Sequence, residues 1–305
     1  MTRRLTNVGA SVRQRLLNFS RERHTDFGIV LIDYALERFL FRLGRSEHRN
    51  RFVLKGAMLF RVWADEPHRS TRDLDLLAYG DPDASVVGAM IQDICRVQVD
   101  DDGVEFEADT MRLEDIREGQ EYLGVRARFG ASIGGARVPV QIDVGFGDAV
   151  TPPAVETTYP TILDYAAPVV RTYPRETVVA EKLHAMVEHG MANSRMKDFY
   201  DVYALALHYT FDGTILCAAI AATFNCRSTP LPTGTPIALS AEFSVDSVKI
   251  TQWRAFVTGG SVDNSALALD DVVVLLGSFL LPPMNAAAAG KPFAGTWVSP
   301  GPWVP

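Results

Sequence analysis

Two segments of the chain combine a strand-like apolar alternation with carboxylates in the opposite phase. In RDLDLLAYG, Asp73 and Asp75 alternate with the apolar residues Leu74 and Leu76. Because residues i and i+2 of a strand point to the same side, both carboxylates are predicted on one face of a sheet, with the leucines in the core. Like charges this close repel each other, and a hard divalent cation with oxygen ligands relieves that repulsion.

The second such segment is VPVQIDVGFGD, in which Asp143 shares its phase with Gln141 and Gly145. A third carboxylate on a second strand would complete a site for two divalent cations, as in phosphoryl transfer. We therefore predict a metal site for Mg²⁺ or Mn²⁺ at Asp73, Asp75 and Asp143. The alternative for Asp143 is a carboxylate at the end of a sheet that binds backbone or an arginine.

A candidate phosphate-binding turn lies at Lys55-Gly56, where a strand-like start (52–54) gives way to a helical pattern. Glycine allows the backbone to approach a ligand closely. The helix N-terminus that follows would present unpaired N–H groups to phosphate, and Lys55 would add a full positive charge. The spacing GxxxxGK[ST] is absent, so the turn is not a P-loop.

Charged residues also lie close to the apolar stripes of two predicted helices, in EKLHAM and RMKDFYD. Lys182 lies near the packing seam of the first helix, and Asp198 and Asp201 share a face of the second. A charge near a seam is usually paired. Lys182 is therefore either half of a structural ion pair with Asp198 or Asp201, or a contact to a nucleotide phosphate.

The order of predicted elements indicates an α+β fold with a mixed sheet that is flanked by helices and carries a site on one face. A mixed α/β part is expected over residues 1–152, and a mainly helical part that completes an active-site cleft over 153–285. The tail 286–305 is rich in Pro, Gly and Ala and is predicted to be poorly ordered.

Composition and charge limit the classes of protein to which the chain can belong. The chain of 305 residues shows no apolar run near the roughly 18 residues of a membrane helix and no secretory signal, so a cytoplasmic protein is expected. Cys95, Cys217 and Cys226 are too few and too widely spaced for a disulfide framework or a zinc site. Residues 1–72 hold 15 Lys/Arg against 7 Asp/Glu in a chain of net charge −7. That basic segment either attracts polyphosphate or RNA, or solvates outer helix faces.

Five motifs together resemble the AbiEii/AbiGii toxin family, which includes the MenT toxins and belongs to the polymerase-beta-like nucleotidyltransferase superfamily. They span residues 52–207 and read FVLKGAMLF, HRSTRDLDLL, VQIDVGFGD, ETVVAEKLHAM and RMKDFYDVYAL. The resemblance implies a metal-dependent enzyme that moves a nucleotidyl group from an NTP to a hydroxyl acceptor. It further implies the 3′ end of tRNA as the acceptor, a block of translation, and a cognate antitoxin.

The resemblance also assigns roles to individual residues. Asp73 and Asp75 match the metal-binding DxD, Lys182 the lysine on the nucleotide phosphates, and Asp198 the acidic residue of a KDxxD motif. The predicted catalytic set is therefore Asp73, Asp75, Asp143, Lys182 and Asp198. The predicted nucleotide-binding set is Lys55, Gly56, Ala57, Arg69 and Lys182. Relatives commonly carry Gly-Gly or Gly-Ser at the turn, so Ala57 leaves no serine hydroxyl for the phosphate.

Two other functions stay open at this stage. The acceptor of the same chemistry could be a protein or a small molecule, as in antibiotic-modifying relatives. A non-catalytic module of the same fold would bind a nucleotide or a partner, but the intact set of Asp73, Asp75, Asp143, Lys55 and Lys182 argues against decay. The sequence does not specify the base, the tRNA species or the oligomeric state.

Overall fold

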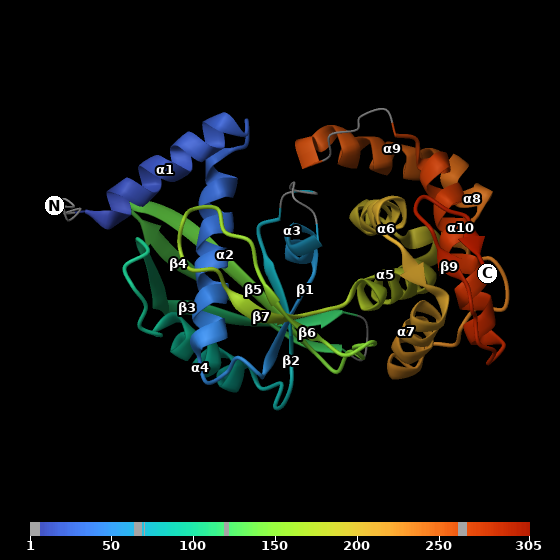
Figure 1. The fold of residues 1–305 in the computed structure, drawn as a ribbon, viewed down its shortest axis with the longest axis horizontal. Coiled ribbons are helices and arrows are strands. Elements are labelled where there is room, and N and C mark those ends of the chain that lie inside the picture. The colour runs from blue at the N-terminus through green and yellow to red at the C-terminus, as the bar shows by residue number, and fades with distance from the viewer. Residues whose placement is uncertain (1–6, 64–68, 70, 119–121, 262–266) are drawn as a thin grey trace. The chain divides into compact units, whose positions relative to one another are not determined.

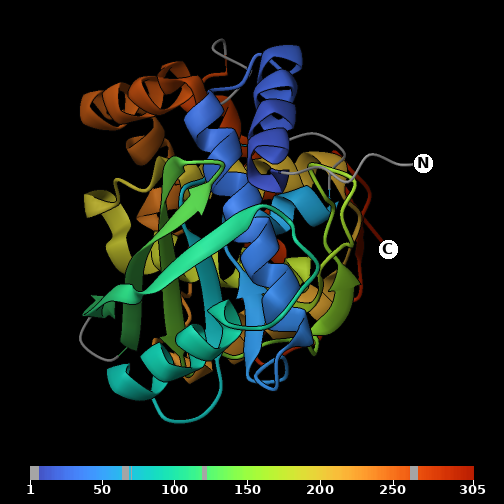
Figure 2. The same ribbon diagram turned by 90° about the vertical axis from the view of Figure 1, so that its left-hand side faces the viewer.

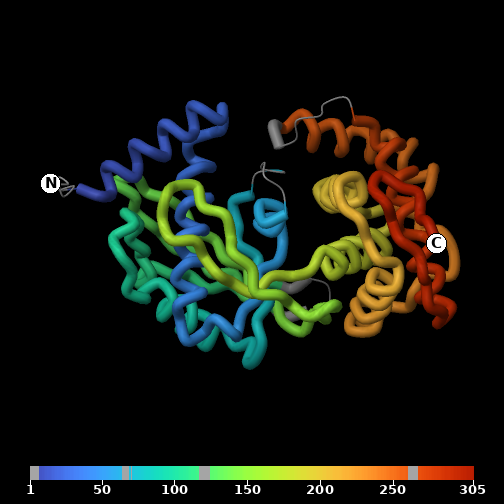
Figure 3. Tube along the Cα trace, viewed as in Figure 1, coloured from blue at the N-terminus to red at the C-terminus, as the bar shows by residue number. Residues whose placement is uncertain are grey.

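The structure is a computed structural model that describes residues 7–63, 69, 71–118, 122–261 and 267–305 (Figure 1). The chain divides into two compact units. Unit 1 comprises Met1–Gly147 and Val155–Thr172, and unit 2 comprises Asp148–Ala154 and Tyr173–Pro305. The path of the chain through both units can be followed in Figure 3.

A seven-stranded mixed sheet in the order β3-β4-β5-β2-β1-β7-β6 forms the centre of unit 1. Strands β1 and β2 are antiparallel, β2 and β5 are parallel, and β1 pairs in parallel with β7. The strands are β1 (Phe52–Lys55), β2 (Leu74–Ala78), β3 (Val104–Glu118), β4 (Tyr122–Ile133), β5 (Ala136–Phe146), β6 (Val155–Thr158) and β7 (Val169–Thr172). The predicted α+β class with a mixed sheet is confirmed.

Helices α2 and α4 contact the sheet of unit 1 and each other, α2 through β5 and β7 and α4 through β3 (Figure 2). The helices of this unit are α1 (Val8–Glu22), α2 (Phe27–Arg45), α3 (Phe60–Trp63) and α4 (Ala84–Cys95). Asp26 and Asp83 cap the N-termini of α2 and α4: the Asp26 side chain accepts a hydrogen bond from the N–H of Ile29, and the Asp83 side chain accepts from two N–H groups of the first turn.

Gly44 has a different role from the helix stop that its position suggests, because α2 continues through it to Arg45. A Cβ added to Gly44 would lie 2.4 Å from the carbonyl oxygen of Val169. The glycine therefore allows α2 to approach β7 closely, which sequence periodicity alone cannot show.

Charged side chains of α2 are buried inside unit 1. Arg42 binds both oxygens of Asp102, with Nη1–Oδ2 and Nη2–Oδ1 distances of 2.8 and 3.1 Å, and Arg38 Nε binds Asp102 Oδ2 at 3.0 Å. Glu37 accepts a hydrogen bond from the backbone N–H of Ile162 at 2.7 Å and lies 3.3 Å from Arg38. Burial raises the pKa of Glu37 to about 7, although Ile162 and Arg38 act in the opposite direction.

Unit 2 is mainly helical, as predicted, and holds a small three-stranded sheet in the order β10-β9-β8. Helices α5, α6, α7 and α10 pack on one another. The elements are α5 (Arg175–His189), α6 (Met196–His208), β8 (Phe211–Asp212), α7 (Gly213–Cys226), α8 (Ala241–Val245), α9 (Ser247–Phe256), α10 (Leu269–Ala288), β9 (Thr296–Trp297) and β10 (Trp303–Val304).

The boundary between the units differs from the predicted cut at residue 152. Segment 155–172, which the predicted cut assigns to the mainly helical part, supplies β6 and β7 to the sheet of unit 1. Segment 148–154 belongs to unit 2, where Asp148 binds Arg227 at 2.8 Å and Thr151 exchanges two hydrogen bonds with Thr177. Two four-residue strands among polar and Pro residues give too short an alternation to be found by pattern.

The tail 286–305 also differs from the prediction of poor order. Trp297 is 1% exposed, and its indole N–H donates to the carbonyl of Ala206 at 2.8 Å. The ring of Trp303 stacks on Phe279 with centroids 5.9 Å apart. Two tryptophans bury enough apolar area to order a segment whose composition otherwise favours disorder.

Among the helices of the described residues, α10 alone is both long enough and apolar enough to cross a membrane, judged by length and composition. It begins with Asp270 and Asp271 in its first turn and contains Pro282 and Pro283. Its apolar side includes Leu276, Phe279 and Leu280, which are fully buried within the protein. A buried core helix passes the same test, so this feature is weak evidence for a membrane span.

Candidate functional site

Three carboxylates meet at the centre of the sheet of unit 1. Asp73 directly precedes β2, Asp75 lies on it, and Asp143 lies opposite Asp75 on β5. One oxygen from each carboxylate can be chosen so that all lie within 4.8 Å of one another, and all three residues are half-buried. Leu74 and Ile142, in the opposite phase, are fully buried. A set of carboxylate oxygens at this spacing suits a hard divalent cation.

Charged residues continue this group across the sheet. In the strand register, Lys55 on β1 is the partner of Asp75, Asp75 of Asp143, and Asp143 of Arg126 on β4. In this row, two central carboxylates lie between two positively charged side chains, one at each end. Cross-strand neighbours on one face have Cβ atoms roughly 5 Å apart, so these charges interact directly.

Arg126 holds Asp143 by both carboxylate oxygens. Its Nε donates to Oδ1 at 2.8 Å and its Nη2 to Oδ2 at 2.7 Å, and Gln141 Nε2 donates to Oδ2 at 3.3 Å. The hydrogen bonds to Asp143 raise the pKa of Arg126, and the negative charges of Asp143 and Asp73 add to this. The arginine-binding alternative for Asp143 is thus observed, within the same group of carboxylates that suits a cation.

Arg126 was not identified from the sequence. It lies in the run VRARFG, where it alternates with the buried residues Val125 and Ala127. That alternation shows that Arg126 points away from the core. The strand register that sets it opposite Asp143 depends on the hairpin at Gly134-Gly135, and only the structure gives it.

The turn at Gly56 requires glycine. Its φ is 73°, and an added Cβ would lie 2.0 Å from Oδ2 of Asp75. The chain continues as a 3-10 turn at Ala57–Leu59 and then as helix α3, whereas the sequence pattern predicts a helix that follows Gly56 directly. Gly56 therefore brings the backbone against the carboxylate group.

The other predicted nucleotide-binding residues of unit 1 lie at the end of β1, in the turn itself and in the segment before β2. Lys55 ends β1 and is half-buried, and Ala57 is 7% exposed. Arg69 is half-buried in the segment between α3 and β2. Thr71 donates hydrogen bonds to the carboxylate and to the carbonyl of Asp73, and so fixes that side chain ahead of the strand.

In unit 2, Lys182 on α5 forms ion pairs with both aspartates of α6. Its Nζ lies 2.5 Å from Oδ1 of Asp198 and 2.8 Å from Oδ2 of Asp201. Arg195 Nε binds the second oxygen of Asp198 at 2.6 Å. Both aspartates are almost fully buried, whereas the Lys182 side chain is 14% exposed. The structural ion pair is therefore present, and the contact of Lys182 with phosphate stays a prediction.

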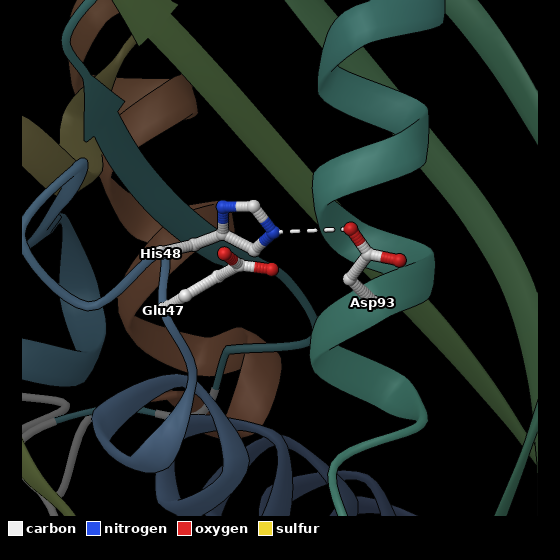
Figure 4. Close-up of side chains that lie close together, drawn as sticks. All are labelled: Glu47, His48 and Asp93. Atoms are coloured by element: carbon white, nitrogen blue, oxygen red, sulfur yellow. Dashed lines mark hydrogen bonds and ion pairs between the residues drawn. The ribbon is translucent and has the colours of Figure 1, made fainter.

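A second group of ligand-type side chains lies at the end of α2, where Glu47 and His48 approach Asp93 of α4 (Figure 4). His48 Nε2 lies 3.2 Å from Oδ2 of Asp93, whose side chain is 55% exposed. Glu47 is exposed as well. Exposed groups of this kind are common without a metal, so we give this cluster no function.

Comparison with known proteins gives one family match. The family model described as "Nucleotidyl transferase AbiEii toxin, Type IV TA system" matches residues 38–273, which include all five motifs. No curated protein matches. Two Helicobacter pylori crystal structures resemble the fold at 13% identity, JHP933 with a TM-score of 0.48 and a proposed nucleotidyltransferase with 0.46. They cover 86% and 85% of this chain, and 90% and 92% of their own.

TM-scores below 0.5 carry no weight for function, so the assignment rests on the family match and on the motifs within it. That match spans more than half of the chain and agrees with the resemblance found from the motifs alone. The protein is accordingly a nucleotidyltransferase, and it belongs to the AbiEii toxin family of type IV toxin–antitoxin systems.

Proposed function

We propose that this enzyme transfers a nucleotidyl group from an NTP to the 3′ end of tRNA in the cytoplasm, with Mg²⁺ or Mn²⁺ at Asp73, Asp75 and Asp143. The observation that carries the proposal is the convergence of three carboxylates beside the Gly56 turn in one unit. A bound divalent cation would link these carboxylates to substrate phosphates and neutralise charge on the transferred group.

The residues of unit 1 supply position and charge. Asp73 and Asp75 hold the cation, with Asp73 fixed by Thr71 and Asp75 by its place in the central strand. Asp143 is the third ligand or the acceptor of the proton from the attacking hydroxyl. Lys55 and the backbone at Gly56 and Ala57 receive the triphosphate, with Arg69 as a further positive charge. Positioning and electrostatics supply most of the acceleration in such reactions.

In unit 2, Lys182 is proposed to contact the nucleotide phosphates, and Asp198 to fix Lys182 for that contact. Two buried aspartates orient the ammonium group and leave 14% of the side chain exposed. Membership in a family of type IV toxin–antitoxin systems implies a cognate antitoxin. Transfer to tRNA would make the enzyme the toxin that blocks translation.

A labelling experiment identifies the acceptor. The protein is incubated with each α-³²P-labelled NTP and Mg²⁺, together with either total tRNA or an RNA-free protein extract. We expect label in a ribonuclease-sensitive tRNA band with one preferred NTP, and none with Asp75→Asn. Label in protein alone would support the second candidate, transfer to a protein, and would exclude tRNA as the acceptor.

A further inference from the structure

Arg126 contacts the carboxylate group but lies outside the five family motifs, so the resemblance gives it no role. It approaches Asp143 side-on and donates two hydrogen bonds, at 2.8 and 2.7 Å, to the two carboxylate oxygens. Paired, charge-assisted bonds of this kind are the strongest and most directional that a carboxylate accepts. The side chains of Arg126 and Asp143 are 29% and 15% exposed, so water competes only in part for this pair.

This pairing has opposite effects on the two forms in which a cation can arrive. A bare divalent cation is repelled by the guanidinium charge and must compete with it for the oxygens of Asp143. The complex of a divalent cation with a nucleoside triphosphate carries a net negative charge, and the same guanidinium attracts it. Interactions between charges a few ångströms apart and partly shielded from water change binding by about tenfold.

We propose that Arg126 is a positioning residue that holds Asp143 back from a bare divalent cation and favours uptake of the cation together with the nucleoside triphosphate. The free enzyme then binds cation weakly, and the carboxylate group is completed when the substrate arrives. This inference rests on the proposed metal site at Asp73, Asp75 and Asp143.

The neighbouring arginine offers a matched control. Arg128 lies two residues further along β4 and donates to Gln141 at 3.0 Å and to Glu114 at 2.7 Å. It has the same charge, the same strand and the same phase, but no bond to a carboxylate of the metal group. A general effect of positive charge on this face would change Mn²⁺ affinity in both arginine variants. An effect of the hydrogen bonds to Asp143 would change it only in Arg126→Gln.

The direct experiment is a titration with Mn²⁺ in the absence of nucleotide, in which the electron paramagnetic resonance signal reports free Mn²⁺. All variants carry Asp93→Asn, so that the exposed Glu47–His48–Asp93 cluster contributes no binding. We expect Arg126→Gln to bind Mn²⁺ about tenfold more tightly, since a repelling charge is removed and a ligand is released. Arg128→Gln is expected to stay within about twofold of the parent. Thermal melting confirms that each variant is folded.

Two further measurements separate the effect of the hydrogen bonds to Asp143 from simple repulsion between the Arg126 charge and the cation. In an Asp143→Asn background, Arg126→Gln is expected to gain about threefold or less, because no third carboxylate is left to release. The KM for the Mn²⁺–NTP complex is expected to rise about tenfold in Arg126→Gln, while bare Mn²⁺ binds more tightly. A purely structural role would not move these two quantities in opposite directions.

The inference fails if Arg126→Gln binds bare Mn²⁺ no more tightly than Arg128→Gln, or gains equally in the Asp143→Asn background. The proposed metal site itself fails if neither the Asp93→Asn parent nor its Arg126→Gln variant binds Mn²⁺, or if adding Asp75→Asn to the Arg126→Gln variant leaves Mn²⁺ binding unchanged. The two failures are therefore distinguishable in one set of titrations.

Discussion

At the scale of single residues, Gly56 is the position whose geometry most restricts substitution. Gly56→Ala adds a Cβ that would lie 2.0 Å from Asp75 Oδ2, so either the carboxylate or the turn must move. We expect turnover to fall at least about 100-fold, since displacement of a catalytic group by about 1 Å has this effect. The measurement is the rate of NTP incorporation at saturating Mg²⁺.

Gly135→Ala is the control for this variant. Gly135 has φ 79°, close to the 73° of Gly56, but an added Cβ meets no atom within 4 Å. Both variants lose about 1 kcal/mol from strained backbone. If Gly135→Ala lost as much turnover as Gly56→Ala, backbone strain and not the contact with Asp75 would explain the effect.

Lys182 is the residue for which the structure adds most to the sequence. The helical pattern alone did not distinguish an ion pair from a phosphate contact, and the structure shows pairs with two buried aspartates. Lys182→Ala is therefore expected to lower the free energy of unfolding by about 3 kcal/mol, because removal of one partner leaves buried charge behind. Activity per folded molecule is expected to be lost as well. Thermal unfolding and NTP incorporation on one sample measure both.

Lys197→Ala is the matched control, since Lys197 is an exposed lysine of the same ion-pair region on α6. It is expected to change neither stability nor activity. Full specific activity in a destabilised Lys182→Ala would contradict the phosphate contact. An unchanged melting curve in Lys182→Ala would show that the ion pairs of Lys182 do not stabilise the fold.

At the scale of elements, helix α2 makes the stability of the protein depend on pH. Burial raises the pKa of Glu37 from 4.5 to about 7 in the folded state. Between these values the folded state binds more protons than the unfolded state, so the free energy of unfolding decreases as pH rises. The cost reaches about 3 kcal/mol above pH 7. Burial raises the pKa of Asp33 to about 6, which acts in the same direction.

Glu37→Gln is expected to flatten this dependence, because an amide oxygen still accepts the hydrogen bond from Ile162 and carries no charge. Denaturant unfolding at pH 5 and pH 8 gives the two free energies. The exposed Glu22 of α1 supplies the control variant Glu22→Gln, which should leave the slope unchanged. An equal slope in the wild type and in Glu37→Gln would show that Glu37 is not the group that titrates.

The elements also show what the sequence could predict. The two carboxylate-bearing strands were found by alternation, and the register places Asp75 opposite Asp143, as a shared site requires. Alternation could not find β6 and β7, which have four residues each and obtain their stability from neighbours in the sheet. The pairing of Arg126 with Asp143 depends on register between strands, which no local pattern specifies.

At the scale of the whole molecule, the chain separates its predicted chemistry between two units. Unit 1 contains the carboxylate group, the Gly56 turn and the basic segment up to residue 72, and unit 2 contains Lys182 and its aspartates. The family match covers residues 38–273 and so includes the carboxylate group, the Gly56 turn, and Lys182 with its aspartates. The proposed transfer to RNA would need a divalent cation and a positive field for phosphates, and the sequence contains groups suited to each.

Nucleotidyl transfer at the carboxylate group of Asp73, Asp75 and Asp143 can be tested by following which phosphorus of the NTP is transferred. The enzyme is incubated with Mg²⁺, total tRNA and the preferred NTP, labelled with ³²P at either the α- or the γ-phosphate. We expect that only the α label enters the product, that the γ label leaves in pyrophosphate, and that Asp75→Asn transfers neither. Transfer of the γ label, or undiminished transfer by Asp75→Asn, would contradict nucleotidyl transfer at this group.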